Sequence, residues 1–481
     1  MRRYRMYIDG AFADHGGALS TVLNPATEEV VSEFPLGTVE QVDAAVDAAE
    51  RAQPAWAKRP AIERAKCLTE IAAALRDKSE ELARVISEEQ GKVLPLARVE
   101  VLFTADYMDY MAGFARRYEG EIIQSDRPNE NIFLYKMPIG VVAGILPWNF
   151  PFFLIARKMA PALVTGNTIV IKPSSLTPNN AFEFARIVDE SSLPKGVFNL
   201  VTGSGREVGS ALAGHPKVGM VSFTGSVPGG VAIMGAASRN VTKVSLELGG
   251  KAPAIVMADA DLDLAVKAIH ASRVINTGQV CNCAERVYVH ASVAEEFTEK
   301  MVEAMRATRF GDPLKDETLD MGPLVSLEQL KSVEAAVARA VGQGASLRLG
   351  GKRAETKKGY HFMPTVFTDC KQDMDIMRQE VFGPVLPIAT FSDLDEAISM
   401  ANDSDYGLTS SIYTTRLDVA LRAANEIRFG ETYINRENFE AMQGFHAGWR
   451  KSGIGGADGR HGLEEFLQTH VVYMQYDPKA Q

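Results

Sequence analysis

At 481 residues the chain is long enough for two or three domains and a large buried core, and its 46% hydrophobic and 23% charged residues are typical of a globular protein. A formal net charge of −10 argues against nucleic acid as a partner, because a phosphate backbone is bound by basic surfaces. Four cysteines are too few for a disulfide framework, which indicates a reducing compartment and predicts a cytoplasmic protein.

Neither a secretion signal nor a membrane span is expected. The basic residues at the N-terminus are followed by no apolar signal core. The most apolar stretch, residues 141–171, is interrupted by polar and charged residues, whereas a spanning helix needs about 18 uninterrupted apolar ones. We therefore expect no membrane partner.

Helical and strand-like segments alternate along the chain. Apolar residues at three- and four-residue spacing predict helical structure over residues 39–90, with Gly91 as its C-terminal cap. Short apolar runs that read as buried strands follow at residues 141–146, 168–171, 197–201 and 220–223. Strands separated by helices imply a parallel sheet, which usually binds nucleotides at the carboxyl ends of its strands.

A second alternation of the same kind begins near Glu247. Its expected strands are residues 254–257, 287–289, 410–413 and 432–434, with helices at 262–272 and 293–308. The chain is therefore predicted to contain two α/β units, with a boundary near Gly249 and Gly250.

Two short motifs, one at the start of this second alternation and one within it, carry reactive groups. Residues 247–251 read Glu-Leu-Gly-Gly-Lys, and residues 278–283 read Gly-Gln-Val-Cys-Asn-Cys. A cysteine nucleophile and a general base are what covalent catalysis on a carbonyl requires, first for thiolate attack and then to activate water against the thioester. Taken alone, Glu247 fits a salt-bridged loop acid equally well, and a lone cysteine is more often an inert small hydrophobe. Cys281 and Cys283 lack a second Cys or His pair at zinc spacing, so no metal site is predicted.

Two more motifs make the pattern specific. Asn149 lies in Pro-Trp-Asn-Phe-Pro at residues 147–151, and Glu380 opens Glu-Val-Phe-Gly-Pro at residues 380–384. Together the four motifs resemble those of the aldehyde dehydrogenase superfamily, over nearly the whole chain. The resemblance implies an NAD(P)-dependent enzyme that oxidises a small-molecule aldehyde.

The resemblance also implies an α/β fold with three parts. These are a Rossmann-type dinucleotide-binding domain at residues 1–117 and 138–248, an α/β catalytic domain at 249–445, and a β oligomerisation arm at 118–137 and 464–481. The sequence supports the arm through a hairpin-like arrangement of residues 121–135. An unpaired edge strand invites association, so we expect a homodimer or a homotetramer.

The resemblance assigns the catalytic roles. The nucleophile is placed two residues after Gln279, which selects Cys281 over Cys283. Glu247 would be the general base, and we expect partial burial to raise its pKa. Asn149 would bind the oxyanion together with the backbone N–H of Cys281.

The cofactor site is implied in the same way. Gly225 and Ser226, at the start of a helix, would hold the pyrophosphate. Glu380 would hold the nicotinamide ribose, while Trp148 and Phe382 would lie near the ring. The glycine-rich run at residues 203–209 reads GxGxxxG rather than the dinucleotide fingerprint GxGxxG, and we interpret its glycines as turn residues.

Two departures from the family pattern matter. Lys172 would contact the adenine ribose. Ser175 stands where many NAD-using members have a glutamate, and the absence of that glutamate removes a clash with a 2′-phosphate. We therefore expect NAD or NADP to serve. Residues 455–458 replace the usual Gly-Arg-Glu-Leu, so the second glutamate that relays protons in some relatives is absent and more of that work falls on Glu247.

Within the superfamily the chain is most similar to lactaldehyde and glycolaldehyde dehydrogenases. The segments that carry this likeness are residues 104–107, 117–128, 280–286, 431–438 and 444–449. A hydroxylated aldehyde needs polar partners, and the predicted set is Arg157, Asn282, Glu440 and His446. A salt-bridged helix residue is the alternative for Arg157, and a satisfied loop histidine is the alternative for His446.

Three competing functions remain open at this point. A CoA-acylating semialdehyde dehydrogenase shares the fold, but such relatives generally lack the base that corresponds to Glu247. A cysteine hydrolase without redox chemistry would not need Lys172, Ser226 and Glu380. A non-enzymatic role is disfavoured because the nucleophile, the base and Asn149 are all present.

Overall fold

The computed structural model describes residues 1–13, 17–356 and 358–477. Its first large sheet has eight strands in the order β20-β12-β11-β8-β9-β10-β2-β3. The five central strands are parallel: β8 (Val141–Ile145), β9 (Thr168–Lys172), β10 (Phe198–Leu200), β11 (Val218–Thr224) and β12 (Lys243–Glu247). The antiparallel edge strands are β20 (Gly453–Ile454), β2 (Met6–Ile8) and β3 (Ala11–Ala13). The predicted buried strands of this region are confirmed.

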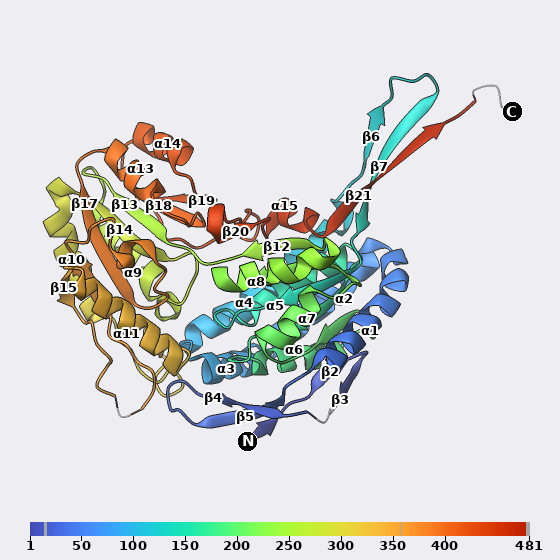
Figure 1. Cartoon of the computed structure of the whole chain (residues 1–481), viewed down its shortest axis with the longest axis horizontal. Helices are drawn as coiled ribbons and strands as arrows, with labels where there is room; N and C mark the ends of the chain where they lie inside the picture. The colour runs from blue at the N-terminus through green and yellow to red at the C-terminus, as the bar shows by residue number, and fades with distance from the viewer. Residues whose placement is uncertain (14–16, 357, 478–481) are drawn as a thin grey trace.

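Helices cover both faces of this sheet (Figure 1). They are α1 (Val39–Lys58), α2 (Ala61–Asp77), α3 (Ser79–Gln90), α4 (Leu94–Ala112), α5 (Phe153–Val164), α6 (Asn179–Asp189), α7 (Ser210–Ala213) and α8 (Val227–Ala237). The predicted helical run 39–90 is therefore three helices, because the chain turns at Pro60 and Lys78. Gly91 caps α3 with a φ of +81°, a left-handed conformation that glycine adopts without strain.

The second large sheet has seven strands in the order β15-β16-β17-β14-β13-β18-β19. Their bounds are β13 (Ala252–Val256), β14 (Ala284–His290), β15 (Ser346–Leu349), β16 (Thr365–Thr368), β17 (Val385–Phe391), β18 (Thr409–Tyr413) and β19 (Glu431–Ile434). All neighbours are parallel except β15 and β16. The helices of this unit are α9 (Leu262–Val274), α10 (Ala294–Ala307), α11 (Leu327–Gly342), α12 (Asp375–Arg378), α13 (Leu394–Asn402) and α14 (Leu417–Glu426).

After the second sheet, the chain returns to the first. Strand β20 pairs with β12 so that Gly453 lies opposite Glu247, and α15 (Gly459–Glu464) follows. A third sheet then projects from the body of the molecule (Figure 1). It joins β6 (Glu121–Gln124), β7 (Glu130–Pro138) and β21 (Leu467–Gln475), and so contains the predicted hairpin. Residues 478–481 of the predicted arm lie outside the described residues.

One small sheet completes the fold. A three-stranded sheet near the N-terminus joins β1 (Arg2–Arg3), β5 (Val30–Pro35) and β4 (Leu19–Leu23). Within the described part of the chain, the helices fall short of the length and apolar character needed to cross a bilayer.

A buried ionic cluster ties the start of β13 to β14. The Glu285 carboxylate accepts hydrogen bonds from Lys251 Nζ at 2.7 Å and pairs with an Arg273 guanidinium nitrogen at 2.9 Å, and all three side chains are fully buried. The same carboxylate accepts the backbone N–H groups of Val381 and Phe382 at 3.2 and 3.3 Å. Glu285 therefore neutralises two buried cations and anchors the segment that precedes β17.

Replacement of Glu285 by glutamine should destabilise the protein by about 3–5 kcal/mol, because it leaves Lys251 and Arg273 buried with their charge uncompensated. The change should appear as a lower urea midpoint of unfolding. The matched control is Glu295→Gln, which removes an exposed ion pair with Arg348 and should change stability by less than about 0.5 kcal/mol. Equal midpoints for the two variants would contradict this view of the cluster.

Candidate active site

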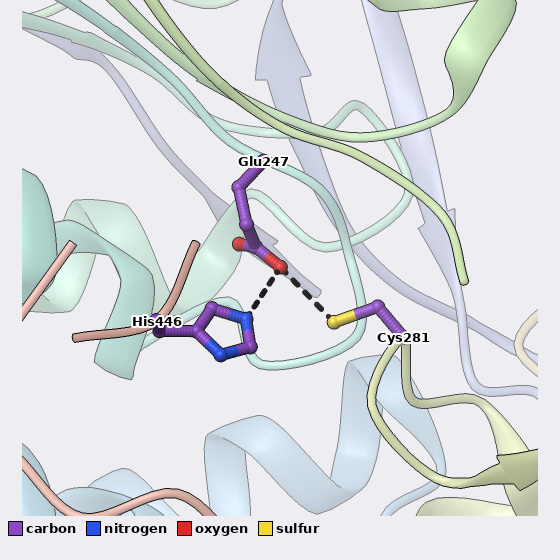
Figure 2. A group of neighbouring side chains, drawn as sticks. All are labelled: Glu247, Cys281 and His446. Atoms are coloured by element: carbon purple, nitrogen blue, oxygen red, sulfur yellow. Dashed lines mark hydrogen bonds and ion pairs between the residues drawn. The ribbon is translucent and has the colours of Figure 1, made fainter. Parts of the chain in front are cut away.

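The reactive thiol and the carboxylate meet between the two large sheets. Glu247 is the last residue of β12, and Cys281 lies in the loop that leads into β14. The Cys281 thiol donates a hydrogen bond to Glu247 Oε1 at 3.1 Å (Figure 2). Gly250 makes this approach possible, since a Cβ there would lie 2.4 Å from the Cys281 carbonyl oxygen. The structure thus brings together the predicted nucleophile and base.

His446 joins this pair from the C-terminal part of the chain. Its Nε2 lies 3.2 Å from Glu247 Oε1 (Figure 2). Its Nδ1 lies 2.5 Å from Glu431 Oε1. Glu431 in turn accepts a hydrogen bond from the Tyr433 hydroxyl. Glu431 and Tyr433 were not predicted as site residues, although their spacing of two residues on a strand places them on one face.

Arg157 lies in the buried helix α5 and bridges several acids. Its Nε donates to Asp458 Oδ1 at 3.0 Å, and a second guanidinium nitrogen pairs with the other oxygen of Asp458. Its remaining nitrogen, Nη1, lies 3.6 Å from Glu440 Oε1 and 3.9 Å from Glu247 Oε2. Asp458, in the segment that departs from the family pattern, therefore positions the arginine.

The charges around Glu247 oppose the effect of its burial. Burial acts to raise the pKa of Glu247, but the hydrogen bond and charge of His446, with the charge of Arg157, hold this pKa well below its usual range. The expectation that its pKa is raised is therefore wrong. Burial and the nearby Glu247 carboxylate raise the pKa of the Cys281 thiol well above its ordinary value. The resting pair is a thiol that donates to an ionised carboxylate.

The imidazole of His446 is held in its charged form. Burial and the charge of Arg157 act to lower the pKa of His446, but the Glu431 carboxylate and the hydrogen bonds to Cys281 and Glu247 raise this pKa well above its ordinary value.

Another cation lies near the site: Lys158 Nζ donates to Ser222 Oγ at 3.1 Å and to Thr224 Oγ1 at 2.9 Å. Burial lowers the pKa of Lys158 to about 7.

Asn149 stands beside the thiol, as predicted. Its Nδ2 donates to the carbonyl of Gln279 at 3.2 Å, and its Oδ1 accepts the N–H of Phe150 at 3.0 Å. An amide nitrogen carries two N–H groups, so the bond to Gln279 leaves a second donor for an oxyanion. Lys92 and Asn276 both donate to the Asn149 backbone carbonyl, at 2.8 and 3.1 Å, and thereby fix this turn.

Two cavities meet at Cys281. Glu247, Asn149 and Thr224 also line both of them. The first has an aromatic wall of Phe103, Phe150, Phe153 and Phe439. Among the described residues, it is also lined by Arg157, Asn282 and Glu440 but not by His446, which is 1% exposed. Asn282 Nδ2 donates to the Glu440 carboxylate.

The second cavity is lined by the predicted residues Trp148, Gly225, Ser226, Glu380 and Phe382. The rings of Trp148 and Phe382 pack edge to face with centroids 5.4 Å apart. Ser226 is the N-cap of α8, where its Oγ accepts the N–H of Gly229 at 3.2 Å, so the helix N-terminus opens toward the cavity. An anion-binding helix end, apposed aromatic rings and a carboxylate fit a dinucleotide.

Glu380 closes the far side of this cavity. Its Oε1 accepts the Gly250 N–H at 2.8 Å, and burial raises its pKa to about 8. Lys172 is the last residue of β9 and Ser175 follows it, at the carboxyl edge of the sheet, but neither residue lines the cavity described. Lys172 Nζ donates to the Pro173 carbonyl at 2.8 Å, and Ser175 Oγ donates to the Gly203 carbonyl at 3.1 Å.

Comparison with known proteins agrees with this architecture. The aldehyde dehydrogenase family model matches residues 12–472. The chain is 64% identical to lactaldehyde dehydrogenase of Escherichia coli strain K12, over 98% of this chain and 99% of that protein. The crystal structure of lactaldehyde dehydrogenase from Escherichia coli matches with a TM-score of 0.98, covering 98% of this chain and 99% of the other. D-glyceraldehyde dehydrogenase (NADP(+)) of Picrophilus torridus is 39% identical, over 98% of this chain and 96% of that protein.

The chain therefore belongs to the aldehyde dehydrogenase family. The predicted family and the α/β fold are confirmed, and the chain is an aldehyde dehydrogenase. The family uses NAD or NADP, and this chain has a second cavity beside Cys281.

Cys281→Ser should lower kcat for aldehyde oxidation by at least about 1,000-fold, because a hydroxyl is a far weaker nucleophile than a thiolate. The assay is the absorbance of the reduced cofactor under saturating substrate. Cys283→Ser is the matched control, since that buried thiol donates to the Val280 carbonyl at 2.9 Å, and it should retain activity. Wild-type turnover in the Cys281 variant would contradict the assignment.

Proposed function

We propose that this enzyme oxidises a small hydroxyaldehyde, such as lactaldehyde or glycolaldehyde, to the carboxylic acid with NAD or NADP. The observation that carries the proposal is the first cavity, where Arg157, Asn282 and Glu440 face the reactive thiol within a largely aromatic wall. The 64% identity to lactaldehyde dehydrogenase of Escherichia coli supports the same substrate class.

The first half of the reaction uses the thiol, the carboxylate and the amide. Cys281 Sγ attacks the aldehyde carbon and its proton passes to Glu247, which is ionised at neutral pH and lies 3.1 Å away. Asn149 and the Cys281 backbone N–H stabilise the oxyanion of the thiohemiacetal. NAD or NADP, when bound in the second cavity, supplies the hydride acceptor.

The second half releases the acid. Glu247 first releases to solvent the proton that it took from the thiol. It then removes a proton from water, the hydroxide attacks the thioester carbon, and the Cys281 thiolate leaves and regains a proton from Glu247. We propose that His446 positions Glu247 through its Nε2, 3.2 Å from the carboxylate. Direct contact of His446 with the substrate remains a prediction.

Recognition of the substrate hydroxyl rests on paired polar groups. For the substrate hydroxyl, Arg157 is a hydrogen-bond donor and the Glu440 carboxylate is an acceptor. Burial is the main cause that raises the pKa of Glu440. An aldehyde that lacks the hydroxyl leaves these buried groups with fewer partners, which costs free energy of binding. The aromatic side chains limit the room available and favour a short substrate.

Glu440→Ala should lower kcat/KM for lactaldehyde by about 10- to 100-fold more than kcat/KM for propanal, because only lactaldehyde loses a hydrogen bond to a charged group. Steady-state kinetics with both aldehydes measures this ratio. The control is Glu437→Ala in the same loop, whose side chain is 45% exposed and pairs with Arg436. An equal loss for both aldehydes would argue against a hydroxyl contact.

We propose that NADP is accepted as well as NAD. Lys172 and Ser175 lie at the carboxyl edge of the first sheet, with serine in the place of the acid that would repel a 2′-phosphate. The name of the Picrophilus torridus relative specifies NADP(+). Burial lowers the pKa of Lys172 to about 8, so the lysine charge is present below that pH and is lost above it.

The KM for NADP should therefore rise by about tenfold as the lysine loses its charge, since a charged hydrogen bond to phosphate is lost. Both KM values should be measured over a pH range of about one unit on either side of the Lys172 pKa of about 8. The KM for NAD should change little over this pH range. Ser175→Glu, which restores the acid, should abolish NADP use. A kcat/KM for NADP more than about 100-fold below that for NAD at neutral pH would contradict the proposal.

The main alternative is a CoA-acylating semialdehyde dehydrogenase of the same fold. Glu247 favours water as the acyl acceptor, because the base lies beside the thiol where the thioester forms. Release of free acid without CoA distinguishes the two activities.

We also propose that the projecting sheet of β6, β7 and β21 is the oligomerisation arm of a cytoplasmic homodimer or homotetramer, with the domain limits predicted above. Its exposed apolar side chains support association, among them Ile122 (74% exposed) and Tyr473 (67% exposed). The four cysteines are all free, which fits a reducing compartment.

A further inference from the structure

Three side chains of different chemistry present metal-binding atoms to one point. Cys281 Sγ, a carboxylate oxygen of Glu247 and a ring nitrogen of His446 all lie within 4.8 Å of one another (Figure 2). We propose that this triad is an inhibitory binding site for Zn²⁺, which would hold the catalytic sulfur as a zinc thiolate and block its attack on the aldehyde.

Two of the three distances within the triad are close to those that tetrahedral zinc imposes, and the third, between Cys281 Sγ and the His446 ring nitrogen, is at most 4.8 Å. With Zn–S near 2.3 Å and Zn–N and Zn–O near 2.1 Å, neighbouring ligand atoms lie about 3.4–3.6 Å apart. Glu247 Oε1 is 3.1 Å from Cys281 Sγ and 3.2 Å from His446 Nε2. Each of these two pairs needs to separate by only about 0.2–0.5 Å to accept the ion.

The ligand set favours zinc over the common hard cations. A thiolate, an imidazole and one carboxylate oxygen suit a borderline-soft ion, whereas Mg²⁺ and Ca²⁺ require mainly oxygen ligands. Cys281 and Glu247 also line the aldehyde cavity, so a water molecule can take the fourth coordination position from that side. The site therefore has three protein ligands and one open position.

His446 is oriented as metal-bound histidines are. Its Nδ1 faces the Glu431 carboxylate at 2.5 Å, and Tyr433 donates to that carboxylate in turn. A carboxylate bonded to one ring nitrogen fixes the imidazole and leaves the other nitrogen to bind the metal. Backbone hydrogen bonds between His446 and Ala457, at 2.8 and 2.9 Å, hold the residue in place. The imidazole thus needs no rearrangement to act as a ligand.

Zinc binding is an exchange of one cation for protons. The Cys281 thiol gives up its proton to form the Zn–S bond, and His446 gives up the proton on Nε2 to form the Zn–N bond. Both protons pass to solvent, and nothing is oxidised or reduced. Replacement of two protons by Zn²⁺ leaves the net charge of the triad unchanged, while the positive charge of Arg157 remains balanced by Asp458.

Cobalt provides a direct test on the full-length wild-type enzyme. Addition of Co²⁺ should produce a thiolate-to-cobalt charge-transfer band and tetrahedral d–d absorption, and one equivalent of Zn²⁺ should remove both. Cys281→Ser should abolish the charge-transfer band, whereas Cys67→Ser, a buried cysteine elsewhere in the chain, should retain it. A wild-type protein without the band, or a Cys281 variant that keeps it, would overturn the proposal.

Two further measurements do not depend on the Cys281 variant. Zn²⁺ should protect Cys281 of the wild-type enzyme from alkylation by iodoacetamide, read by mass spectrometry of the peptide. Glu431→Gln should weaken zinc binding by about 10- to 100-fold while the charge-transfer band persists with cobalt, because the ligands remain but lose their orienting partner. Unchanged alkylation in the presence of Zn²⁺, or unchanged zinc affinity in the Glu431 variant, would contradict the site as drawn.

Discussion

The contact between Cys281 and Glu247 is the constraint on which the rest of the site depends. It joins the end of β12 in one sheet to the loop before β14 in the other, at 3.1 Å. This proximity requires glycine at position 250, because a Cβ there would lie 2.4 Å from the backbone carbonyl oxygen of Cys281. The pairing of β20 with β12 then carries the C-terminal segment past the same carboxylate and places His446 against it. Segments distant in sequence thus form one reaction centre where the aldehyde and cofactor cavities meet.

Charge compensation explains how so many ionisable groups are tolerated in a buried site. Arg157 is paired with Asp458, and His446 is paired with Glu431. The cations Arg157 and His446 lie close to Glu247, and their own charges are balanced by Asp458 and Glu431. Glu247 therefore stays ionised despite its burial. The segment at residues 455–458 lacks a glutamate relay but contributes Asp458. Asp458 positions the Arg157 guanidinium, which lines the first cavity, and so connects a departure from the family pattern to the proposed preference for hydroxylated aldehydes.

The family motifs pointed to Cys281, Glu247 and Asn149, and apolar runs predicted β8, β9, β10 and β11 of the first large sheet and β13, β14, β18 and β19 of the second, because these features are local in sequence. The remaining strands of the two sheets were not predicted. The helical run 39–90 was resolved into three helices only by the structure, since the turns at Pro60 and Lys78 do not interrupt the apolar pattern. The charge partners could not be predicted, because Arg157 and Asp458 are 301 positions apart and meet only when the chain has folded. For the same reason the predicted direction of the Glu247 pKa shift was wrong. The prediction considered the burial of Glu247, but the sequence does not show which cations lie next to it in the fold.

The most direct test of the account is to trap the covalent intermediate. Glu247→Gln, with NAD and lactaldehyde at alkaline pH, should form the thioester slowly, because solvent hydroxide replaces Glu247 in deprotonating the thiol, and should then hydrolyse it more slowly still, because hydrolysis loses its general base. The expected result is one slow turnover of reduced cofactor and a lactoyl group that accumulates on the peptide containing Cys281, detected by quenched-flow mass spectrometry. Reduced cofactor formed without any acyl group on that peptide, or with the group on Cys283, would contradict it.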